Sequence, residues 1–354
     1  MITLILLGLL STLFAGVRID KDGKYGLEIA FSLIFIFLAL RYNYGNDYVN
    51  YLNVFNDINR VNSIETFDYA KDYKYEIGWI LLNIMFAQMG FYTMVAVLAA
   101  FHVFFIYRFV KKYVPSKLYW LSVFLYVFNP AFLLIMSSAM RQTVAITFFI
   151  VSLDYVLQNR LYKAVFFLLV GSLFHASALI IIPFCFVGML SNKLKIVHIG
   201  IIFGVFIYLF SSNVLYSYMV AVTLYLDKYL SYSEVKEVGT GLGVIFQSFI
   251  FLFILSNQKF QNRSIRSLFN LGSIAFLFIP LVLFLPMVGR LSMYFQIIIL
   301  IILPYVTLGR RKLLKMTVRI LYILFTLYGF FQFFNTPGWN AYFGDYQTVF
   351  SLVF

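Results

Sequence analysis

The sequence predicts an all-α, polytopic integral membrane protein, and its composition and apolar runs are the reasons. Hydrophobic residues make up 62% of the 354 residues, charged residues only 12%, and the mean hydropathy is +0.90. Soluble proteins carry about 25% charged residues. Because roughly 20 helical residues cross a bilayer core, we expect about 12 transmembrane helices plus short periplasmic or re-entrant helices. Residues 1–354 would form a single integral membrane domain.

Each long apolar run predicts one helix. The first, Met1–Val17, has basic residues after it and none before it, the reverse of a cleavable signal peptide, so we interpret it as a retained helix. Ile77–Met89 is too short to cross comfortably and predicts a shallow or re-entrant helix. The other predicted helices are Tyr25–Leu40, Phe91–Val110, Tyr119–Met140, Thr143–Gln158, Ala164–Phe174, Ala176–Leu190, Val197–Leu215, Gly241–Ser256, Leu268–Met287, Leu291–Leu308 and Met316–Phe334.

The basic residues are distributed unequally between the two faces. Placing the loops on alternate sides puts 19 of the 27 Lys and Arg on one side, together with four of the 14 Asp and Glu. By the positive-inside rule this side is cytoplasmic, and both termini lie outside. Loops 41–76 and 216–240 and the tail 335–354 are then external. Since the basic residues do not gather on one soluble face, we expect no nucleic-acid partner.

Three arginines lie at external helix ends in this topology. Arg141 and Arg290 each fall between two predicted spans, and Arg41 ends the second helix. A guanidinium at this depth costs a few kcal/mol unless it snorkels or binds an anion. Arg141 also lies near a helix N-terminus, which favours a phosphate or diphosphate. The alternative is that each arginine reaches lipid headgroups or pairs with an external carboxylate.

Two external motifs carry carboxylates. RYNYGNDYVNY, residues 41–51, combines a glycine suited to a tight turn with Asp47 and the aromatic residues Tyr44 and Tyr48. YKYEIGW, residues 73–79, contributes Glu76. A carboxylate near arginines stays ionised and can orient a sugar hydroxyl or accept its proton, or it can hold the loop by a salt bridge. The aromatic rings suit either stacking on sugars or an interfacial belt.

His175, in SLFHASAL, lies at the external turn of a short predicted hairpin. An imidazole there suits a base or a hydrogen-bond donor to a substrate, although lone histidines are often structural. Metal and cofactor chemistry is not expected, because the sequence has no spaced cluster of metal ligands and no glycine-rich phosphate loop. The single cysteine, Cys185, excludes an intramolecular disulfide.

Four motifs in order resemble the EpsG-like family, relatives of the Wzy-type O-antigen polymerases. They are RYNYGNDYVNY, YEIGW, MRQTVA and LFHASALIIIPF, spread over residues 41–190. The C-terminal half is similar mainly in hydropathy and in Arg290. The resemblance implies a GT-C-like glycosyltransferase architecture in the bacterial inner membrane. It maps the functional residues of the family onto Arg41, Gly45, Asp47, Tyr48, Glu76, Gly78, Arg141, Gln142 and His175.

The activity implied by the resemblance is polysaccharide polymerisation. Such proteins transfer a growing glycan from undecaprenyl diphosphate to the non-reducing end of a lipid-linked repeat unit, on the periplasmic face and without metal or nucleotide sugar. Donor and acceptor are both undecaprenyl-diphosphate-linked oligosaccharides in the lipid bilayer. A chain-length regulator and a flippase are further candidate partners. The resemblance leaves open which sugars are joined and whether the enzyme inverts or retains configuration.

The residues take the following roles in this hypothesis. Arg141 and Arg290 bind diphosphate with help from Arg41, and Asp47, Glu76 or His175 handles the acceptor. The residues Tyr44, Tyr48 and Gln142 bind sugar or hold the loop. The RX10G motif of some Wzy proteins is absent, since Ser152 and Ile301 stand eleven residues after Arg141 and Arg290. The rival functions are a flippase, which would place polar residues near the midplane, and an O-antigen ligase, which would use the same donor.

Overall fold

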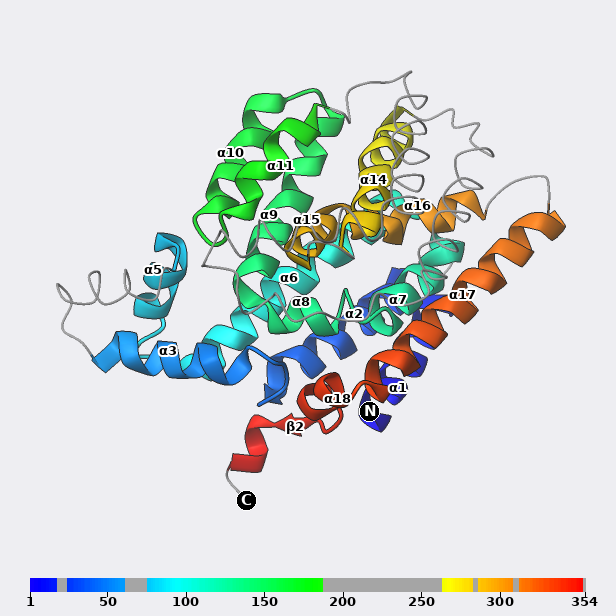
Figure 1. Cartoon of the computed structure of the whole chain (residues 1–354). Coiled ribbons are helices and arrows are strands. Elements are labelled where there is room, and N and C mark those ends of the chain that lie inside the picture. Colours follow the sequence, from blue (N-terminus) through cyan, green and yellow to red (C-terminus); the bar gives the residue numbers. More distant parts are fainter. Residues whose placement is uncertain (18–23, 61–74, 187–262, 283–285, 308–311, 353–354) are drawn as a thin grey trace, which may run out of the picture. The chain divides into compact units, whose positions relative to one another are not determined.

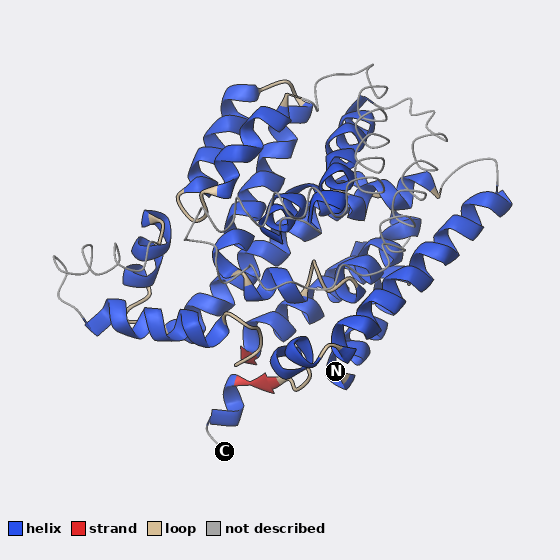
Figure 2. Ribbon diagram, viewed as in Figure 1, coloured by secondary structure: helices blue, strands red, loops and turns tan. Residues whose placement is uncertain are grey.

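The described residues fold mainly into helices (Figures 1 and 2). The computed structural model describes residues 1–17, 24–60, 75–186, 263–282, 286–307 and 312–352. The predicted helices Val197–Leu215 and Gly241–Ser256 and the predicted external loop 216–240 lie outside the described residues. The described residues contain one pair of very short strands, so the fold class is all-α.

The chain divides into two compact units, Met1–Ile182 with Thr307–Phe354, and Pro183–Val306. The second unit contains α14 (Arg263–Val282), α15 (Pro286–Gln296) and α16 (Ile299–Val306), and α11 (Ser177–Cys185) begins in the first unit and ends in the second. The helices of the first unit are α1 (Ile2–Gly16), α2 (Lys24–Leu40), α3 (Tyr48–Arg60), α5 (Ile77–Met85), α6 (Phe91–Tyr113), η1 (Ser116–Leu118), α7 (Tyr119–Phe128), α8 (Leu134–Ser138), α9 (Met140–Leu157), α10 (Leu161–Ser172), α17 (Lys312–Asn335), α18 (Pro337–Phe343) and η4 (Val349–Leu352).

The core of the first unit is a series of neighbouring helices. Helix α1 packs against α2 and α7, α2 against α6, α6 against α9, and α9 against α10. Helix α9 is central because Ala145, Ile146, Phe149 and Leu153 are completely buried. These residues recur at the spacing of helical turns, so they form a continuous apolar face on α9. This face is buried where α9 packs between α6 and α10.

Three described helices are long and apolar enough to cross a membrane: Phe91–Tyr113, Met140–Leu157 and Lys315–Asn335. A fourth candidate is the bent pair Gly289–Gln296 and Ile299–Val306, whose axes differ by 51°. Shorter apolar helices are Ile2–Gly16, Tyr25–Leu40, Ser116–Phe128 and Leu161–Ser172. The membrane class is therefore confirmed, whereas a total of about 12 spans is not established by the described residues.

Two predicted helices are broken in the structure, and both single-helix predictions were wrong. Tyr119–Met140 ends at Phe128, where Asn129 is extended and Pro130 lacks the N–H that a continuing helix would need. The side chain of Asn129 accepts a hydrogen bond from the Ala131 N–H at 3.1 Å and forms the turn that leads to α8. Leu291–Leu308 is divided between α15 and α16. Arg290 consequently lies inside α15 and not between two spans.

The predicted external loop and tail contain structure that the sequence did not indicate. Helix α3 is amphipathic, and its buried face includes Tyr51, Phe55 and Ile58. Strand β1 (Arg41–Tyr42) pairs antiparallel with β2 (Gln347–Thr348). The pairing of β1 with β2 joins the start of the predicted external loop to the C-terminal tail. In the predicted re-entrant segment, α5 is nine residues long, which confirms a short helix there.

Candidate functional site

Arg141 and Glu76 form an ion pair at the start of α9. The Arg141 Nη1 donates to Glu76 Oε2 at 2.6 Å, and their side chains are 20% and 21% exposed. Arg141 is the second residue of α9, so its predicted position at a helix N-terminus is confirmed. A partly shielded pair interacts more strongly than a fully exposed one, because less water screens the two charges.

Glu76 is also held from its other side. Its Oε1 accepts a hydrogen bond from the Ala176 N–H at 3.1 Å, and the Gly78 N–H donates to the Leu173 carbonyl at 2.8 Å. A Cβ on Gly78 would lie 2.6 Å from that carbonyl oxygen, so the close approach requires glycine. The start of α5 is thereby fixed to the turn between α10 and α11.

His175 lies in that same turn and is half-buried. Its Nδ1 lies 2.6 Å from Ser177 Oγ and accepts the Ser177 N–H at 3.3 Å. Because a backbone N–H can only donate, Nδ1 is the acceptor and a neutral ring carries its proton on Nε2. His175 directly precedes the Ala176 amide that binds Glu76, so the structure brings the turn of His175 to the ion pair.

Aromatic side chains surround the arginine. The guanidinium carbon of Arg141 lies 4.3 Å from the centroid of the Tyr75 ring, within cation–π range. Tyr51 is 5% exposed and lies close enough to interact with the charges of Arg141 and Asp47. Burial raises the pKa of the Tyr51 phenol, which keeps it neutral. We call Asp47, Tyr51, Tyr75, Glu76 and Arg141 the Arg141 cluster.

Asp47 is positioned by a turn that folds over α8. Its backbone N–H donates to Ser138 Oγ at 3.1 Å, and its carboxylate accepts from Asn46 Nδ2 at 3.0 Å. Gly45 has a φ of +127°, and a Cβ there would lie 2.8 Å from Ser138 Oγ. Both the backbone conformation and the space therefore require glycine in this motif. Ser138 lies three residues before Arg141, so this turn is fixed beside the start of α9.

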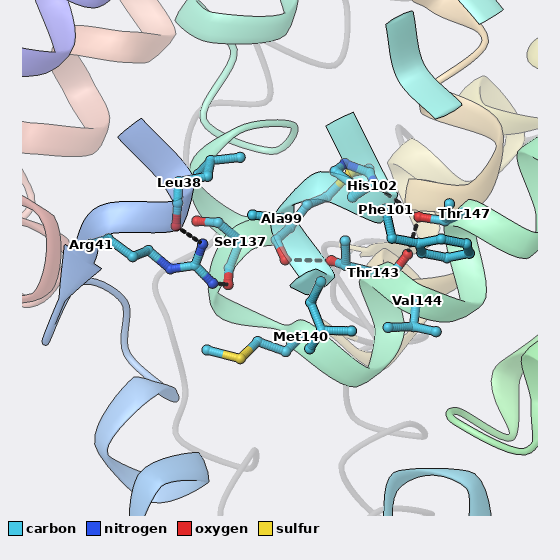
Figure 3. Close-up of a pocket in the computed structure, with 12 residues that line it drawn as sticks. Leu38, Arg41, Ala99, Phe101, His102, Ser137, Met140, Thr143, Val144 and Thr147 are labelled. Atoms are coloured by element: carbon cyan, nitrogen blue, oxygen red, sulfur yellow. Dashed lines mark hydrogen bonds between the residues drawn. The ribbon is translucent and has the colours of Figure 1, made fainter. Parts of the chain in front are cut away.

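Arg41 has a different environment, deep in the first unit (Figure 3). Its side chain is only 3% exposed, with Nη1 donating to the Leu38 carbonyl at 2.8 Å and Nη2 to the Ser137 carbonyl at 2.9 Å. The Tyr48 hydroxyl in turn donates to the Arg41 carbonyl at 3.0 Å. The guanidinium therefore joins the end of α2 to α8.

The cavity beside Arg41 is small (Figure 3). It is also lined by Ser137, His102, Thr143 and Thr147, and it offers about 20 Å³ to the centre of a water molecule. A buried water needs roughly 10–15 Å³ of such space, so the cavity has room for a water molecule but not for a diphosphate. The buried Arg41 Nε and His102 Nε2 have no protein partner, and a water there would bond to polar groups of this kind.

The remaining predicted site residues differ in exposure. Tyr44 and Tyr48 are at most 1% exposed, and Gln142 is 3% exposed. The Tyr44 ring packs edge-on against Phe343 at 5.3 Å between centroids. These contacts favour the loop-holding role over sugar stacking for the two tyrosines. Arg290 is exposed on α15 in the second unit, and its diphosphate role stays a prediction.

Sequence reasoning did not select Tyr51, Tyr75 and Ser138. Tyr51 follows Asp47 by four residues, and its N–H bonds to the Asp47 carbonyl at 3.0 Å, so helical spacing was an available signal. Tyr75 adjoins Glu76 in the chain. Ser138 has no such signal, because its partners are about 90 residues away. Among the described residues, no three His, Cys, Asp or Glu side chains form a group that could hold a metal ion.

Comparison with known proteins gives one match. The model of the EpsG family matches residues 25–348. No curated protein and no solved structure matches the chain. The match covers the motifs of residues 41–190 and also the C-terminal half, so it confirms the resemblance and extends it over nearly the whole chain.

Proposed function

The chain belongs to the EpsG family, and from this premise we propose that it is a polysaccharide polymerase. It transfers a growing glycan from undecaprenyl diphosphate to the non-reducing end of a lipid-linked repeat unit, at the periplasmic face of the bacterial inner membrane. Family membership and the apolar helices support the coarser statement, a multi-pass membrane protein of polysaccharide biosynthesis. About 12 spans and a GT-C-like architecture belong to the same proposal.

The Arg141 cluster is the observation that carries this proposal. A guanidinium in the first turn of a candidate membrane-spanning helix is held by a carboxylate and lies over an aromatic ring. The N-terminus of α9 adds a partial positive charge at the same place. A preorganised cation near the membrane surface suits a lipid-borne diphosphate, which presents its charge at the headgroup level.

The reaction requires one bond to break and one to form. The acceptor hydroxyl attacks the anomeric carbon of the donor glycan, and the bond between that carbon and the diphosphate oxygen breaks. The hydroxyl proton passes to a base, and undecaprenyl diphosphate leaves with the bonding electron pair. Negative charge grows on the diphosphate in the transition state, so interactions that strengthen there accelerate the step.

Arg141 would bind the departing diphosphate. Its Nη1 donates to Glu76, and because the side chain stays 20% exposed, another part of the guanidinium can contact an anion. Arginine presents its donors in a planar fork that matches phosphate oxygens. The contact with Glu76 fixes the direction of the fork, so the group needs little reorganisation when charge develops.

The carboxylates and the histidine take different roles in this proposal. Both oxygens of Glu76 already accept hydrogen bonds, from Arg141 and from the Ala176 amide, so we assign Glu76 to positioning Arg141. The half-buried carboxylate of Asp47 then serves as the base for the acceptor hydroxyl. His175 would donate a hydrogen bond to a substrate oxygen from Nε2, since Nδ1 accepts from Ser177.

Polymerisation by the purified chain tests the proposal. A lipid-linked repeat unit incubated with wild-type protein should give a ladder of longer glycans, with or without a chelator. Arg141→Ala should give no ladder within the time in which the wild type forms one, because its rate is strongly reduced, while Arg60→Ala, which removes an exposed arginine from α3, should behave as wild type. Transbilayer movement of the repeat without new glycosidic bonds would indicate a flippase. Transfer to a different acceptor without chain growth would indicate a ligase.

A further inference from the structure

A second cavity lies at the opposite end of α9 from Arg141. It is bounded by the last turns of α6 and α9 and by the residues that lead into α10, and its volume is about 370 Å³. The start and end of α9 are separated by 17 residues, or about 25 Å at 1.5 Å per residue. The cavity is therefore remote from the Arg141 cluster and independent of the function proposed for it.

The lining of this cavity changes from apolar to charged along the helices. On α6 it passes from Phe105 to Lys112, and along α9 it passes from Ile150 to Gln158 and Arg160, which lie just beyond the end of that helix. Each of these segments is about 10–12 Å long. The apolar residues lie toward the middle of the candidate membrane spans, and the charged residues lie toward their ends. This amphipathic gradient resembles that of a lipid, with its polar headgroup at one end and its acyl chains at the other.

The charged end is cationic. Arg108, Lys112 and Arg160 line it together with a single carboxylate, Asp154. Asp154 is already neutralised by Lys112, since Lys112 Nζ lies 2.8 Å from its Oδ1, and Tyr113 donates to the same oxygen at 2.5 Å. Within the described residues, Arg108 and Arg160 have no carboxylate within ion-pair distance. The guanidinium groups of Arg108 and Arg160 can therefore bind an anion from outside the protein.

We propose that this cavity binds the phosphate headgroup of an anionic phospholipid. Arg108 and Arg160 contact the phosphate, and the glycerol and upper acyl chains lie along Phe105 and Ile150. Basic pockets between membrane helices are suited to anionic headgroups, and arginine binds phosphate through parallel N–H donors. A free phosphate would occupy only the charged end, so the apolar end of the cavity favours the lipid.

Lipid binding to the purified full-length chain in detergent tests the site. Native mass spectrometry would compare phosphatidylglycerol with phosphatidylcholine carrying the same acyl chains. The wild-type chain should bind phosphatidylglycerol about 10- to 30-fold more tightly, as expected for two cations near a phosphate. Arg108→Gln with Arg160→Gln should abolish this difference. Lys117→Gln, which removes an exposed cation outside the cavity, should preserve it.

Two further measurements distinguish a loss of charge from a loss of fold, and a lipid from free phosphate. Arg108→Lys with Arg160→Lys retains the charges and should keep most of the headgroup discrimination, which separates loss of charge from loss of fold. Inorganic phosphate at millimolar concentration should not displace the lipid. Equal binding of the two lipids by the wild-type chain, discrimination that survives in the double glutamine variant, or displacement by inorganic phosphate would overturn the proposal.

Discussion

Arg41 and Arg141 lie on the same predicted face of the membrane, yet their surroundings differ. Arg41 is 3% exposed and donates to two backbone carbonyls beside a cavity with room for a water molecule. The side chain of Arg141 is 20% exposed, pairs with a carboxylate and lies over a tyrosine ring. Arg41 is bound to backbone carbonyls of its own chain, whereas Arg141 is held by a side-chain carboxylate and stays partly exposed.

The hydrogen-bond partner of each arginine indicates whether it has a structural or a functional role. Carbonyl oxygens satisfy a buried guanidinium by hydrogen bonds, and removing the guanidinium leaves them unpaired inside the protein. A carboxylate orients a guanidinium and leaves its other N–H groups available to a second anion. We therefore expect substitutions of Arg41 to act on stability and substitutions of Arg141 to act on catalysis.

Arg141→Ala should have the largest effect on activity. Removing a preorganised donor from a developing charge typically lowers turnover about 100- to 1,000-fold. The rate of polymer formation by purified protein should fall by that factor, while gel filtration shows an unchanged profile. Arg141→Lys should recover part of the rate, because the charge remains and the planar fork is lost. Wild-type activity in the Ala variant would remove Arg141 from the diphosphate site.

Arg41→Ala should instead destabilise the fold. Two buried carbonyls lose their donors, each at a cost of about 1–3 kcal/mol. The midpoint of thermal unfolding in detergent should fall clearly below that of the wild type, and activity per folded molecule should change little. The exposed Arg60→Ala variant is the matched control for the loss of one arginine. An Arg41→Ala protein of normal stability that makes no polymer would instead assign Arg41 to substrate binding.

Glu76→Gln should produce an intermediate effect. The amide oxygen can still accept the Ala176 N–H, but the charge that orients Arg141 is lost. Because hydrogen bonds to charged groups contribute about 1.5–3 kcal/mol, we expect the polymerisation rate to fall about 10- to 100-fold. Glu76→Asp, which keeps the charge on a shorter side chain, should retain more activity than Gln. A fully active Gln variant would contradict the positioning role.

Tyr75 should give the smallest effect. Tyr75→Leu removes the ring beneath the Arg141 guanidinium, a contact of about 0.5–2 kcal/mol, whereas Tyr75→Phe keeps the ring. Polymerisation should slow about 2- to 30-fold in the Leu variant and stay near wild type in the Phe variant. Equal loss in both variants would point to the hydroxyl group and not to the ring.

The parts of the fold that depend on local sequence were predictable. Hydropathy located the helix beginning at Phe91 and the short helix beginning at Ile77, and the polar interruption at Arg141 marked a helix start. The break after Phe128 differs from the single helix that the apolar character of Tyr119–Met140 predicts, although Pro130 is a signal for it in the sequence.

The parts that depend on distant partners were not predictable. Glu76 and Arg141 are 65 residues apart, and the sequence around Glu76 is equally compatible with a salt bridge and with a role in proton transfer. The pairing of Arg41 with Thr348 joins the segment after α2 to the C-terminal tail, and strands of two residues leave no periodic pattern. Backbone donors such as the Ala176 amide carry no side-chain signature at all.

Direct binding of a polyprenyl diphosphate to the purified chain in neutral phosphatidylcholine nanodiscs would decide the role of Arg141. The dissociation constant should rise about 10- to 100-fold in Arg141→Ala relative to the wild type, as expected for losing charge-assisted hydrogen bonds. The Arg60→Ala control should bind as the wild type does. Equal affinity of the wild-type and Arg141→Ala proteins for the diphosphate would contradict the assignment of this arginine as its ligand.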